Sequence, residues 1–372
     1  MSHSRPRVLG VIALRVIPAA IAVVMLAAPS AHAELATHLD IIGWDKIEAD
    51  ARFSGLVDDG GRGQGIAIFD TGIDASHTLF DGRNVTGTNF AADPSTPEWT
   101  DRNGHGTLVG SIAAGNAAKA SNGTDLGGVA RGADLVAVRV LDSEGEGGFN
   151  GIVQGLDYVI NRIDDHGSDI SVINMSLGTT TTFLTEPTGG VIEDFNARVE
   201  SLADRGVAVV AASGNSGSQT GLSFPAISDM VFAVGSSDGG DNVSSFTNRN
   251  NELDLLAPGE DVIGAFQDPS NSALLASGSG TSFAAPQVSG ALVLMQDIFE
   301  DRWGRRATVE ELFDIATTSA VTVMDSEQAF PRLDLFSALD RAYTIPEPGT
   351  IWLFALAALL VTQRRRTKPL HL

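Results

Sequence analysis

Four polar residues in distinctive settings could together carry out acyl transfer. Ser282 follows Gly280 and Thr281 at the expected start of a helix, and His105 has a glycine on each side. Asp70 ends one apolar run and Asn215 follows another. A serine hydroxyl is a poor nucleophile unless a base accepts its proton, an acid orients that base, and donors stabilise the oxyanion. The four residues offer one candidate for each role, with the neutral imidazole as the base near pH 7.

Each residue taken alone also has an ordinary structural interpretation. A serine at a helix start can be an N-cap, an aspartate after a strand can sit in a turn, and Asn-x-Gly sequences favour turns. Asp70-Thr71-Gly72 also resembles the aspartic protease signature, but no second Asp-Thr-Gly or Asp-Ser-Gly supplies the paired carboxylate. It is the combination of four settings that favours catalysis.

A second serine, Ser237, stands in a sequence motif that resembles another class of enzyme. The segment 235–239, Gly-Ser-Ser-Asp-Gly, matches the Gly-x-Ser-x-Gly elbow of α/β-hydrolases and follows an expected strand. That elbow should lead into a helix and be followed by an acid and a histidine. Gly240, Asp241 and Asn242 come next instead, and the only later histidine is His371 near the chain end. We therefore reject the elbow.

The elements that must position these residues alternate along the middle of the chain. Strands are expected at 65–69, 135–140, 170–175, 207–212 and 230–234, and helices at 105–118, 149–165, 191–204, 281–299 and 308–318. Nearly continuous apolar strands are typical of a parallel sheet buried on both faces. The pattern predicts an α/β fold of three layers, with a mostly parallel central sheet and helices on both faces. Asp70 and Asn215 then lie at the carboxyl ends of strands, where such folds collect functional groups.

The beginning of the chain has the pattern of a signal peptide. Residues 1–33 combine Arg5, Arg7 and Arg15 with an apolar run, 16–28, that is too short to cross a bilayer. Ala31-His32-Ala33 then places small residues where a signal peptidase reads. We expect export across the inner membrane and cleavage after Ala33.

The end of the chain resembles a bacterial sorting signal. Residues 345–372 combine Pro346-Glu347-Pro348 with an uncharged stretch, 350–362, and three arginines at 364–366. This order resembles the PEP-CTERM tail of Gram-negative bacteria, which implies processing by an exosortase, transient contact with the inner membrane, and a secreted or cell-surface product. The alternative is an ordinary C-terminal anchor, although 13 residues of helix reach only about 20 Å.

Residues 34–344 are long enough for one large domain and need no second one. They hold 17 Lys and Arg against 45 Asp and Glu, a net charge of −28. Such an acidic surface keeps an exported protein soluble and argues against binding nucleic acid. The chain has no cysteine, which excludes disulfides, thiol catalysis and thiolate metal sites.

The order Asp70, His105, Asn215, Ser282, each in its own motif within residues 40–342, resembles the subtilisin family of serine endopeptidases (peptidase S8 type). The resemblance implies a subtilisin-like fold and hydrolysis of peptide bonds through an acyl-enzyme on Ser282, with no cofactor for catalysis. Asp70 would orient His105, the general base, and Asn215 with the Ser282 amide would form the oxyanion hole. A catalytically silent surface binding protein is the alternative from another class, and an esterase is a third.

The resemblance also implies how a protein or peptide substrate is held. Ser176-Leu177-Gly178 and the segment from Gly145 through Gly147 to Gly148 resemble two edges that pair with an extended peptide. Ala212, Ser213 and Gly214 resemble one wall of the primary specificity pocket. Their small side chains predict a roomy, apolar pocket.

Three features depart from the family pattern. Phe283 stands where many members have methionine, which removes an oxidisable sulfur next to the nucleophile. Leu79 stands where a carboxylate often binds structural calcium, so that ion is in doubt even though Asn122 to Gly128 resembles its loop. Only 36 residues separate Ala33 from Asp70, which leaves no room for the usual inhibitory propeptide.

Overall fold

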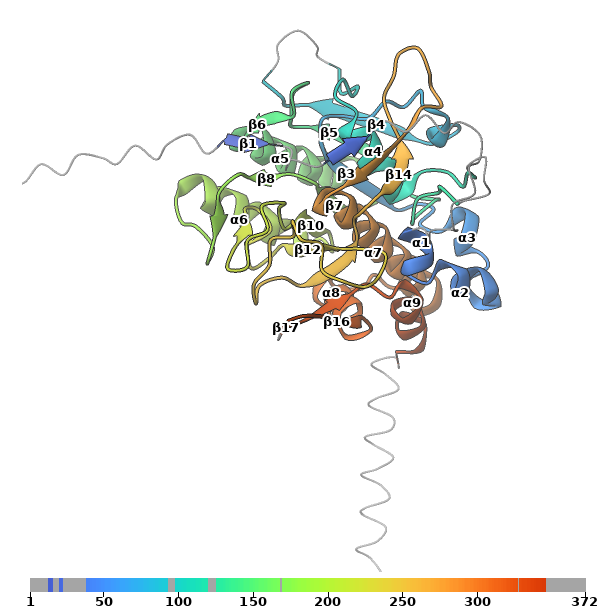
Figure 1. The fold of residues 1–372 in the computed structure, drawn as a ribbon. Coiled ribbons are helices and arrows are strands. Elements are labelled where there is room, and N and C mark those ends of the chain that lie inside the picture. Colours follow the sequence, from blue (N-terminus) through green and yellow to red (C-terminus); the bar gives the residue numbers. More distant parts are fainter. Residues whose placement is uncertain are drawn as a thin grey trace, which may run out of the picture.

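The computed structural model describes residues 13–15, 20–22, 38–92, 98–119, 125–167, 169–326 and 328–345. Figure 1 shows how their helices and strands are arranged. The predicted tail, 345–372, lies outside the described residues except for Ile345. The predicted signal peptide also lies outside them, apart from the short strands β1 (Ala13–Arg15) and β2 (Ala20–Ala22).

A nine-stranded sheet forms the centre of the described chain, in the order β16-β17-β13-β12-β10-β7-β3-β5-β4. Its neighbours pair in parallel except for β16, which runs antiparallel to β17 at one edge. The strands are β3 (Gly65–Asp70), β4 (Val85–Asn89), β5 (Asp134–Arg139), β7 (Ile170–Met175), β10 (Ala208–Ala212), β12 (Phe232–Ser237), β13 (Leu255–Pro258), β16 (Val321–Asp325) and β17 (Gln328–Arg332).

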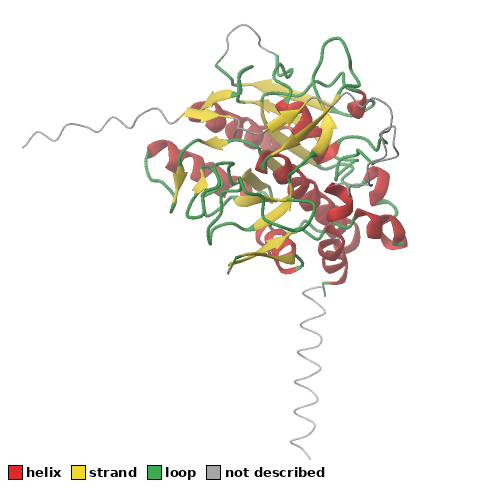
Figure 2. Cartoon of the chain, viewed as in Figure 1, coloured by secondary structure: helices red, strands yellow, loops and turns green. Residues whose placement is uncertain are grey.

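Helices cover both faces of this sheet, as Figure 2 shows. Alternate side chains of each strand point to opposite faces. In β3, Ile66 and Ile68 join one hydrophobic core and Ala67 and Phe69 join the other. The first core is completed by α4 (His105–Ala114), α7 (Thr281–Trp303), α8 (Val309–Thr318) and α9 (Leu335–Thr344), and the second by α5 (Phe149–His166) and α6 (Gly190–Ala203). The predicted three-layer α/β fold is confirmed.

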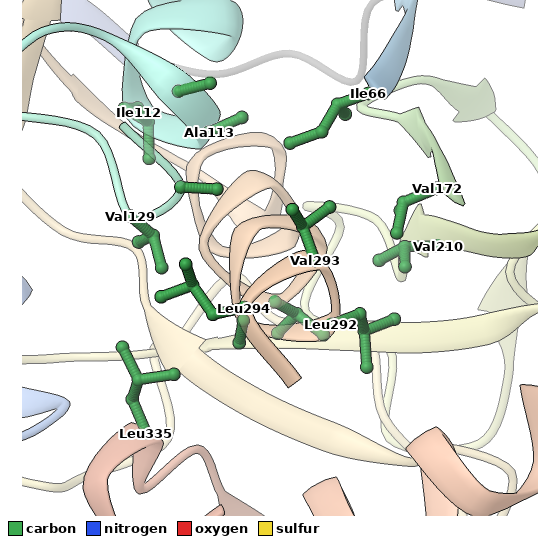
Figure 3. Packing of buried hydrophobic residues seen from close by; sticks show 14 of the residues in the cluster. Ile66, Ile112, Ala113, Val129, Val172, Val210, Leu292, Val293, Leu294 and Leu335 are labelled. Carbon is green, nitrogen blue, oxygen red and sulfur yellow. The ribbon is translucent and has the colours of Figure 1, made fainter. Parts of the chain in front are cut away.

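Helix α7 lies at the centre of the first core. Leu292, Val293 and Leu294 on α7 pack against residues of the sheet, α4 and α9, as Figure 3 shows. The helix is buried over most of its length, from Thr281 to Phe299. Its first turn, which contains Ser282, is therefore held by a rigid scaffold rather than by a loop.

Short elements complete the fold. Helices α1 (His38–Ile41), α2 (Trp44–Ala49) and α3 (Leu56–Asp59) precede β3, with 3-10 turns η1 (Ala51–Phe53) and η2 (Thr78–Phe80) nearby in sequence. Three small sheets have the orders β6-β1-β8, β14-β15-β2 and β11-β9. Their remaining strands are β6 (Glu146–Gly148), β8 (Gly178–Thr179), β9 (Thr182–Phe183), β11 (Leu222–Ser223), β14 (Val262–Ala265) and β15 (Leu275–Ser279).

Two details differ from expectation or extend it. The helix expected at 105–118 ends at Ala114, because Gly115 adopts an extended conformation after its N–H has bonded the Ser111 carbonyl. Strand β12 continues to Ser237, and the rejected elbow there leads into a turn rather than a helix. Among the helices described, none has the length and apolar character needed to cross a membrane.

Candidate active site

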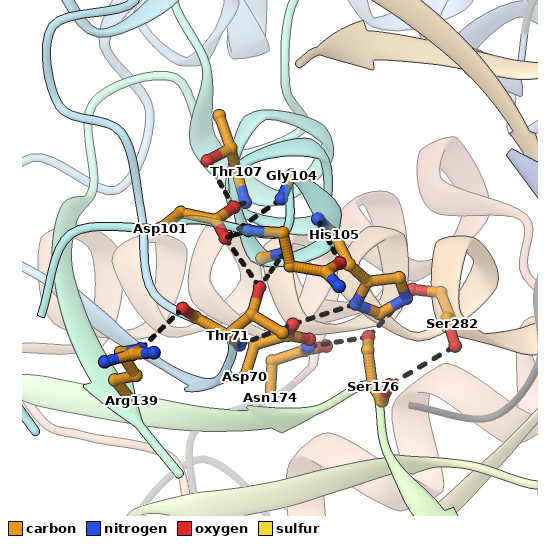
Figure 4. A network of polar contacts seen from close by, with 12 residues as sticks. Asp70, Thr71, Asp101, Gly104, His105, Thr107, Arg139, Asn174, Ser176 and Ser282 are labelled. Atoms are coloured by element: carbon orange, nitrogen blue, oxygen red, sulfur yellow. Dashed lines mark hydrogen bonds and ion pairs between the residues drawn. The ribbon is translucent and has the colours of Figure 1, made fainter. Parts of the chain in front are cut away.

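Asp70 and His105 meet at the carboxyl end of β3. Asp70 is the last residue of that strand and His105 is the first residue of α4. The His105 Nδ1 atom lies 2.8 Å from Asp70 Oδ1, and both side chains are fully buried. Figure 4 shows this pair within a network of polar contacts. Because Nδ1 faces a carboxylate, it carries the proton, and Nε2 is left as the acceptor.

The glycines beside His105 bring α4 close to the end of β3. Gly104 caps the helix with φ of +102°, a conformation that favours glycine. A Cβ atom on Gly106 would lie 2.2 Å from the Gly72 carbonyl oxygen and 3.1 Å from Asp70 Cβ. A side chain at Gly106 would force the helix away from the strand, so this glycine sets the spacing of the buried pair, whereas a Cβ atom on Gly104 would meet the Phe266 ring.

The second imidazole nitrogen of His105 faces Ser282. In Figure 4 the ring lies between the Asp70 carboxylate and Ser282. Nε2 is buried and has no hydrogen-bond partner among the described residues. The Ser282 hydroxyl donates instead to the Ser176 carbonyl, at 3.3 Å. The Phe283 ring lies 5.6 Å from the imidazole ring, centroid to centroid, and supports it from the start of α7.

The backbone of Ser282 is fixed by a side chain from the sheet. Pro286 lies four residues later in α7 and has no N–H to bond the Ser282 carbonyl, as an ordinary helical residue would. The Ser176 hydroxyl fills that place by donating to the carbonyl at 2.7 Å. Asn174 donates to the same hydroxyl at 2.9 Å and accepts from Ser289 of α7. Ser176 thus has a structural role that its sequence setting did not reveal.

Asn215 is oriented by the residue before Ser282. Its Oδ1 atom accepts from the backbone N–H and the hydroxyl of Thr281, at 2.9 and 2.8 Å. The N–H donor identifies the amide oxygen, so the NH₂ group of Asn215 points away from Thr281. Ser282 is the second residue of α7, where backbone N–H groups have no partner within the helix. Asn215 and Ser282 thus lie next to each other at the start of α7, and their role as oxyanion donors stays a prediction.

The two predicted substrate edges lie on either side of a third strand. β1 pairs antiparallel with β6, where Leu14 faces Gly147, and with β8, where Arg15 faces Gly178. Gly145 makes the turn before β6 with φ of +74°. Ser176 and Leu177 lead from β7 into β8, and the Leu177 side chain is buried in the second core. Only the Leu177 backbone is thus placed to contact a substrate.

β2 extends this arrangement toward Ser282. It pairs antiparallel with β15, with Ala20 opposite Ser279 and Ala22 opposite Ser277. β15 leads through Gly280 directly into α7. Both described segments of the N-terminal region therefore pair with strands that flank the candidate site (Figure 1).

The proposed pocket wall is organised by Asn248, which the sequence gave no reason to single out. Its Oδ1 atom accepts from the N–H groups of Ser216 and Ser218 and from the Ser216 hydroxyl. Its NH₂ group donates to the Ser213 carbonyl. A Cβ atom on Gly214, where φ is +110°, would lie 2.1 Å from that NH₂ group. Ala212 ends β10 and is buried in the first core, so its side chain does not line a pocket.

The two described residues considered for a structural calcium site, Leu79 and Asp125, are poor ligands for that ion. Leu79 is apolar and buried, and Asn122 to Thr124 lie outside the described residues. The Asp125 carboxylate accepts two hydrogen bonds of 3.0 Å from Arg131, whose guanidinium also stacks over the Trp44 ring. The described chain contains no cluster of three or more acidic or histidine side chains arranged for a metal ion. The Arg131 guanidinium, rather than a metal ion, therefore neutralises the Asp125 carboxylate.

Comparisons with known proteins agree with this geometry. A model of the subtilase family matches residues 61–336, and a model of the PEP-CTERM protein-sorting motif matches residues 344–366. The chain is 35% identical over 261 residues to the major intracellular serine protease of Bacillus subtilis (strain 168), covering 68% of this chain and 74% of that protein. It is 39% identical over 233 residues to subtilisin DY of Bacillus licheniformis, covering 62% and 75%.

A fungal relative extends the same pattern. The chain is 34% identical over 268 residues to the subtilisin-like serine protease Pen ch 13 of Penicillium rubens, covering 70% of this chain and 61% of that one. The serine endopeptidase class and the sorting tail, both predicted from the sequence, are confirmed. The tail indicates export and sorting in a Gram-negative bacterium. This chain belongs to the subtilase family.

Proposed function

We propose that Ser282, His105 and Asp70 form the catalytic triad of an exported serine endopeptidase. The observation that carries the proposal is the buried 2.8 Å contact between His105 Nδ1 and Asp70, which leaves Nε2 on the Ser282 side of the ring with no hydrogen-bond partner among the described residues. A base needs that arrangement: one nitrogen held by an acid and the other open to the nucleophile's proton. Nothing else is bonded to Nε2 in the described chain, so no competing partner has to leave.

The reaction would proceed through an acyl-enzyme. The Ser282 hydroxyl turns from the Ser176 carbonyl toward Nε2, since such contacts often tighten only when substrate binds. Oγ attacks the scissile carbonyl carbon as Nε2 takes its proton, and the oxyanion accepts hydrogen bonds from the Ser282 N–H and the Asn215 NH₂ group. His105 then protonates the leaving amine. A water, activated by the same base, releases the acid and restores Ser282.

A peptide substrate would bind in extended form between β6 and β8. The antiparallel pairing of β1 with both strands supports this, because it demonstrates that the two edges accept a third strand. Pairing through the backbone selects for an extended chain more than for particular side chains. The loop of Ser213 and Gly214, held by Asn248, would border the primary specificity pocket.

The termini would govern where the enzyme works. A signal peptidase would cleave after Ala33, and an exosortase would process the tail after export. The product would then be the domain 34–344, secreted or held at the cell surface. Catalysis would need no cofactor, since every group in the mechanism belongs to the chain. We derive no step through calcium, because Arg131 holds Asp125 and Leu79 offers no ligand.

The test compares the exported product of the full chain with Ser282→Ala. The wild type should cleave casein and be labelled at Ser282 by a fluorophosphonate, and the variant should do neither. Ser237→Ala is the matched control, because it removes the buried serine of the rejected elbow and should leave both activities intact. A folded wild type that neither cleaves nor labels would instead favour the silent binding protein. Activity on esters alone would favour an esterase.

A further inference from the structure

We propose that Asp101 is a positioning residue that fixes His105 relative to Asp70, acting through Thr71 and the first turn of α4. The proposal rests on the proposed function, since positioning matters only if this pair is catalytic. Asp101 lies in the loop before α4 and is 1% exposed. Its position is visible in Figure 4.

The Asp101 carboxylate accepts hydrogen bonds from five donors. Oδ1 accepts from the Thr71 hydroxyl at 2.9 Å and from the N–H groups of Asn103 and Gly104 at 2.9 and 3.0 Å. Oδ2 accepts from the N–H and the hydroxyl of Thr107 at 2.9 and 2.6 Å. A buried carboxylate is costly unless such bonds satisfy it, and these bonds also bind the residues on both sides of His105.

Thr71 carries the connection to Asp70. Its N–H donates to Asp70 Oδ1 at 2.7 Å, the same oxygen that faces His105 Nδ1. Its hydroxyl donates to Asp101 and accepts from the Gly106 N–H at 3.0 Å. One hydroxyl therefore joins the residue after Asp70 to the residue after His105. Arg139 donates to the Thr71 carbonyl at 3.1 Å and fixes the next peptide group from the neighbouring strand.

Asp101 also caps the N-terminus of α4, together with Asn103 and Thr71, which accept the N–H groups of His105 and Gly106. Gly104 occupies the cap position and has no side chain to accept from the first turn. The Asp101 carboxylate accepts from two N–H groups of that turn, and its negative charge suits the positive end of the helix. An asparagine at 101 would keep the shape of the side chain but lose its charge. Its NH₂ group would also face N–H and hydroxyl groups that already act as donors.

Disrupting the hydrogen bonds of Asp101 should reduce the turnover number rather than weaken substrate binding. The network reaches β3 and α4, whereas the proposed substrate edges are β6 and β8. A looser network would lengthen the Asp70–His105 contact, and a misplacement of about 1 Å can cost about 10²-fold in rate. We expect kcat to fall while KM changes little.

The experiment uses the exported product of the full chain and two substitutions at Thr71. Thr71→Val keeps the shape and removes the bridging hydroxyl, and Thr71→Ser restores it. Asp101→Asn removes the carboxylate, and Asp254→Asn is the matched control because it neutralises another carboxylate, partly buried, that accepts a backbone N–H. The measurements are kcat, KM, the melting temperature, and the downfield NMR resonance of the His105 Nδ1 proton.

Thr71→Val and Asp101→Asn should lower kcat by about 10- to 10²-fold and shift the Nδ1 resonance, while Thr71→Ser and Asp254→Asn stay near wild type. The double variant should lose no more than Asp101→Asn alone, because the two side chains act as one unit. A folded Thr71→Val variant with wild-type kcat and a wild-type Nδ1 resonance would overturn the proposal. The comparison of Thr71→Val with Thr71→Ser tests the positioning role even if Asp101→Asn does not fold. An inactive wild type would contradict the proposed function. The resonance of the His105 Nδ1 proton in the variants would still test the positioning role of Asp101.

Discussion

Replacing Gly106 by alanine should separate the helix that carries His105 from the strand that carries Asp70. The added Cβ atom would lie 2.2 Å from the Gly72 carbonyl oxygen, and ordinary contact begins at 3.4 Å. The backbone must therefore yield by about 1 Å, because both groups belong to the main chain and neither can rotate away. A shift of that size exceeds what the 2.8 Å contact between His105 and Asp70 can absorb and remain a hydrogen bond.

The expected loss is about 10²-fold in kcat, with a destabilisation of about 1–3 kcal/mol from overpacking. Gly110→Ala is the matched control, since it lies on the same helix and the only tight contact of its Cβ would be with the Ile73 Cδ1 atom, at 3.2 Å. That end of a side chain can move, and alanine gains up to about 1 kcal/mol of helix propensity over glycine. Casein turnover and urea unfolding of both variants test the reasoning. Wild-type turnover and stability in Gly106→Ala would refute it.

Three further predictions concern the oxyanion donor, the site between β6 and β8 that β1 occupies, here called the groove, and a partly buried acid. Asn215→Ala should lower kcat by about 10²–10³-fold with little change in KM, the range known for the oxyanion asparagine of subtilisin. An unchanged kcat would contradict the role of Asn215 as a donor. A synthetic peptide of residues 11–24 should inhibit casein cleavage competitively, and Leu14→Pro in that peptide should weaken it by removing a ladder N–H; non-competitive inhibition would argue against pairing in the groove. Burial raises the pKa of Asp254 to about 6, so its ionisation costs stability as pH rises from about 4 to 6. Asp254→Asn should match wild type below pH 4 in urea unfolding and exceed it above pH 6 by as much as about 3 kcal/mol, and a pH-independent difference would refute this.

The parts of the fold predicted from sequence are those with a strong local signal. The strands ending at Asp70 and Ala212 are continuous apolar runs, and such runs identify the buried centre of a parallel sheet. The edge strand β4 was missed because none of its residues is fully buried and its sequence includes Gly87. β16 and β17 were missed for a related reason, since exposed and polar residues interrupt their apolar pattern.

The site residues divide in a similar way. Asp70, His105, Asn215 and Ser282 stand in compact motifs, and a motif can be read without knowing the fold. Asp101, Asn174 and Asn248 hold those residues in place, but each of them does so partly through a partner that is distant in sequence. Asp101 did leave a trace in the sequence, because it lies three residues before the cap position Gly104, close to where capping aspartates occur. Local patterns thus identify groups that react, and the tertiary structure identifies groups that hold them.

The N-terminal segment illustrates where local patterns permit two interpretations. Its run of Val16, Ile17, Ile21 and Val23 suits the apolar core of a signal peptide and, being β-branched, equally suits an extended strand. The local conformational propensity of these residues cannot decide between a signal peptide and a strand. The partners of β1 and β2 are strands more than 130 residues away in sequence. If the peptide of residues 11–24 competes with substrate, cleavage after Ala33 would remove an occupant of the groove as well as an export signal. Removal of the signal peptide would then also open the site between β6 and β8 to substrate.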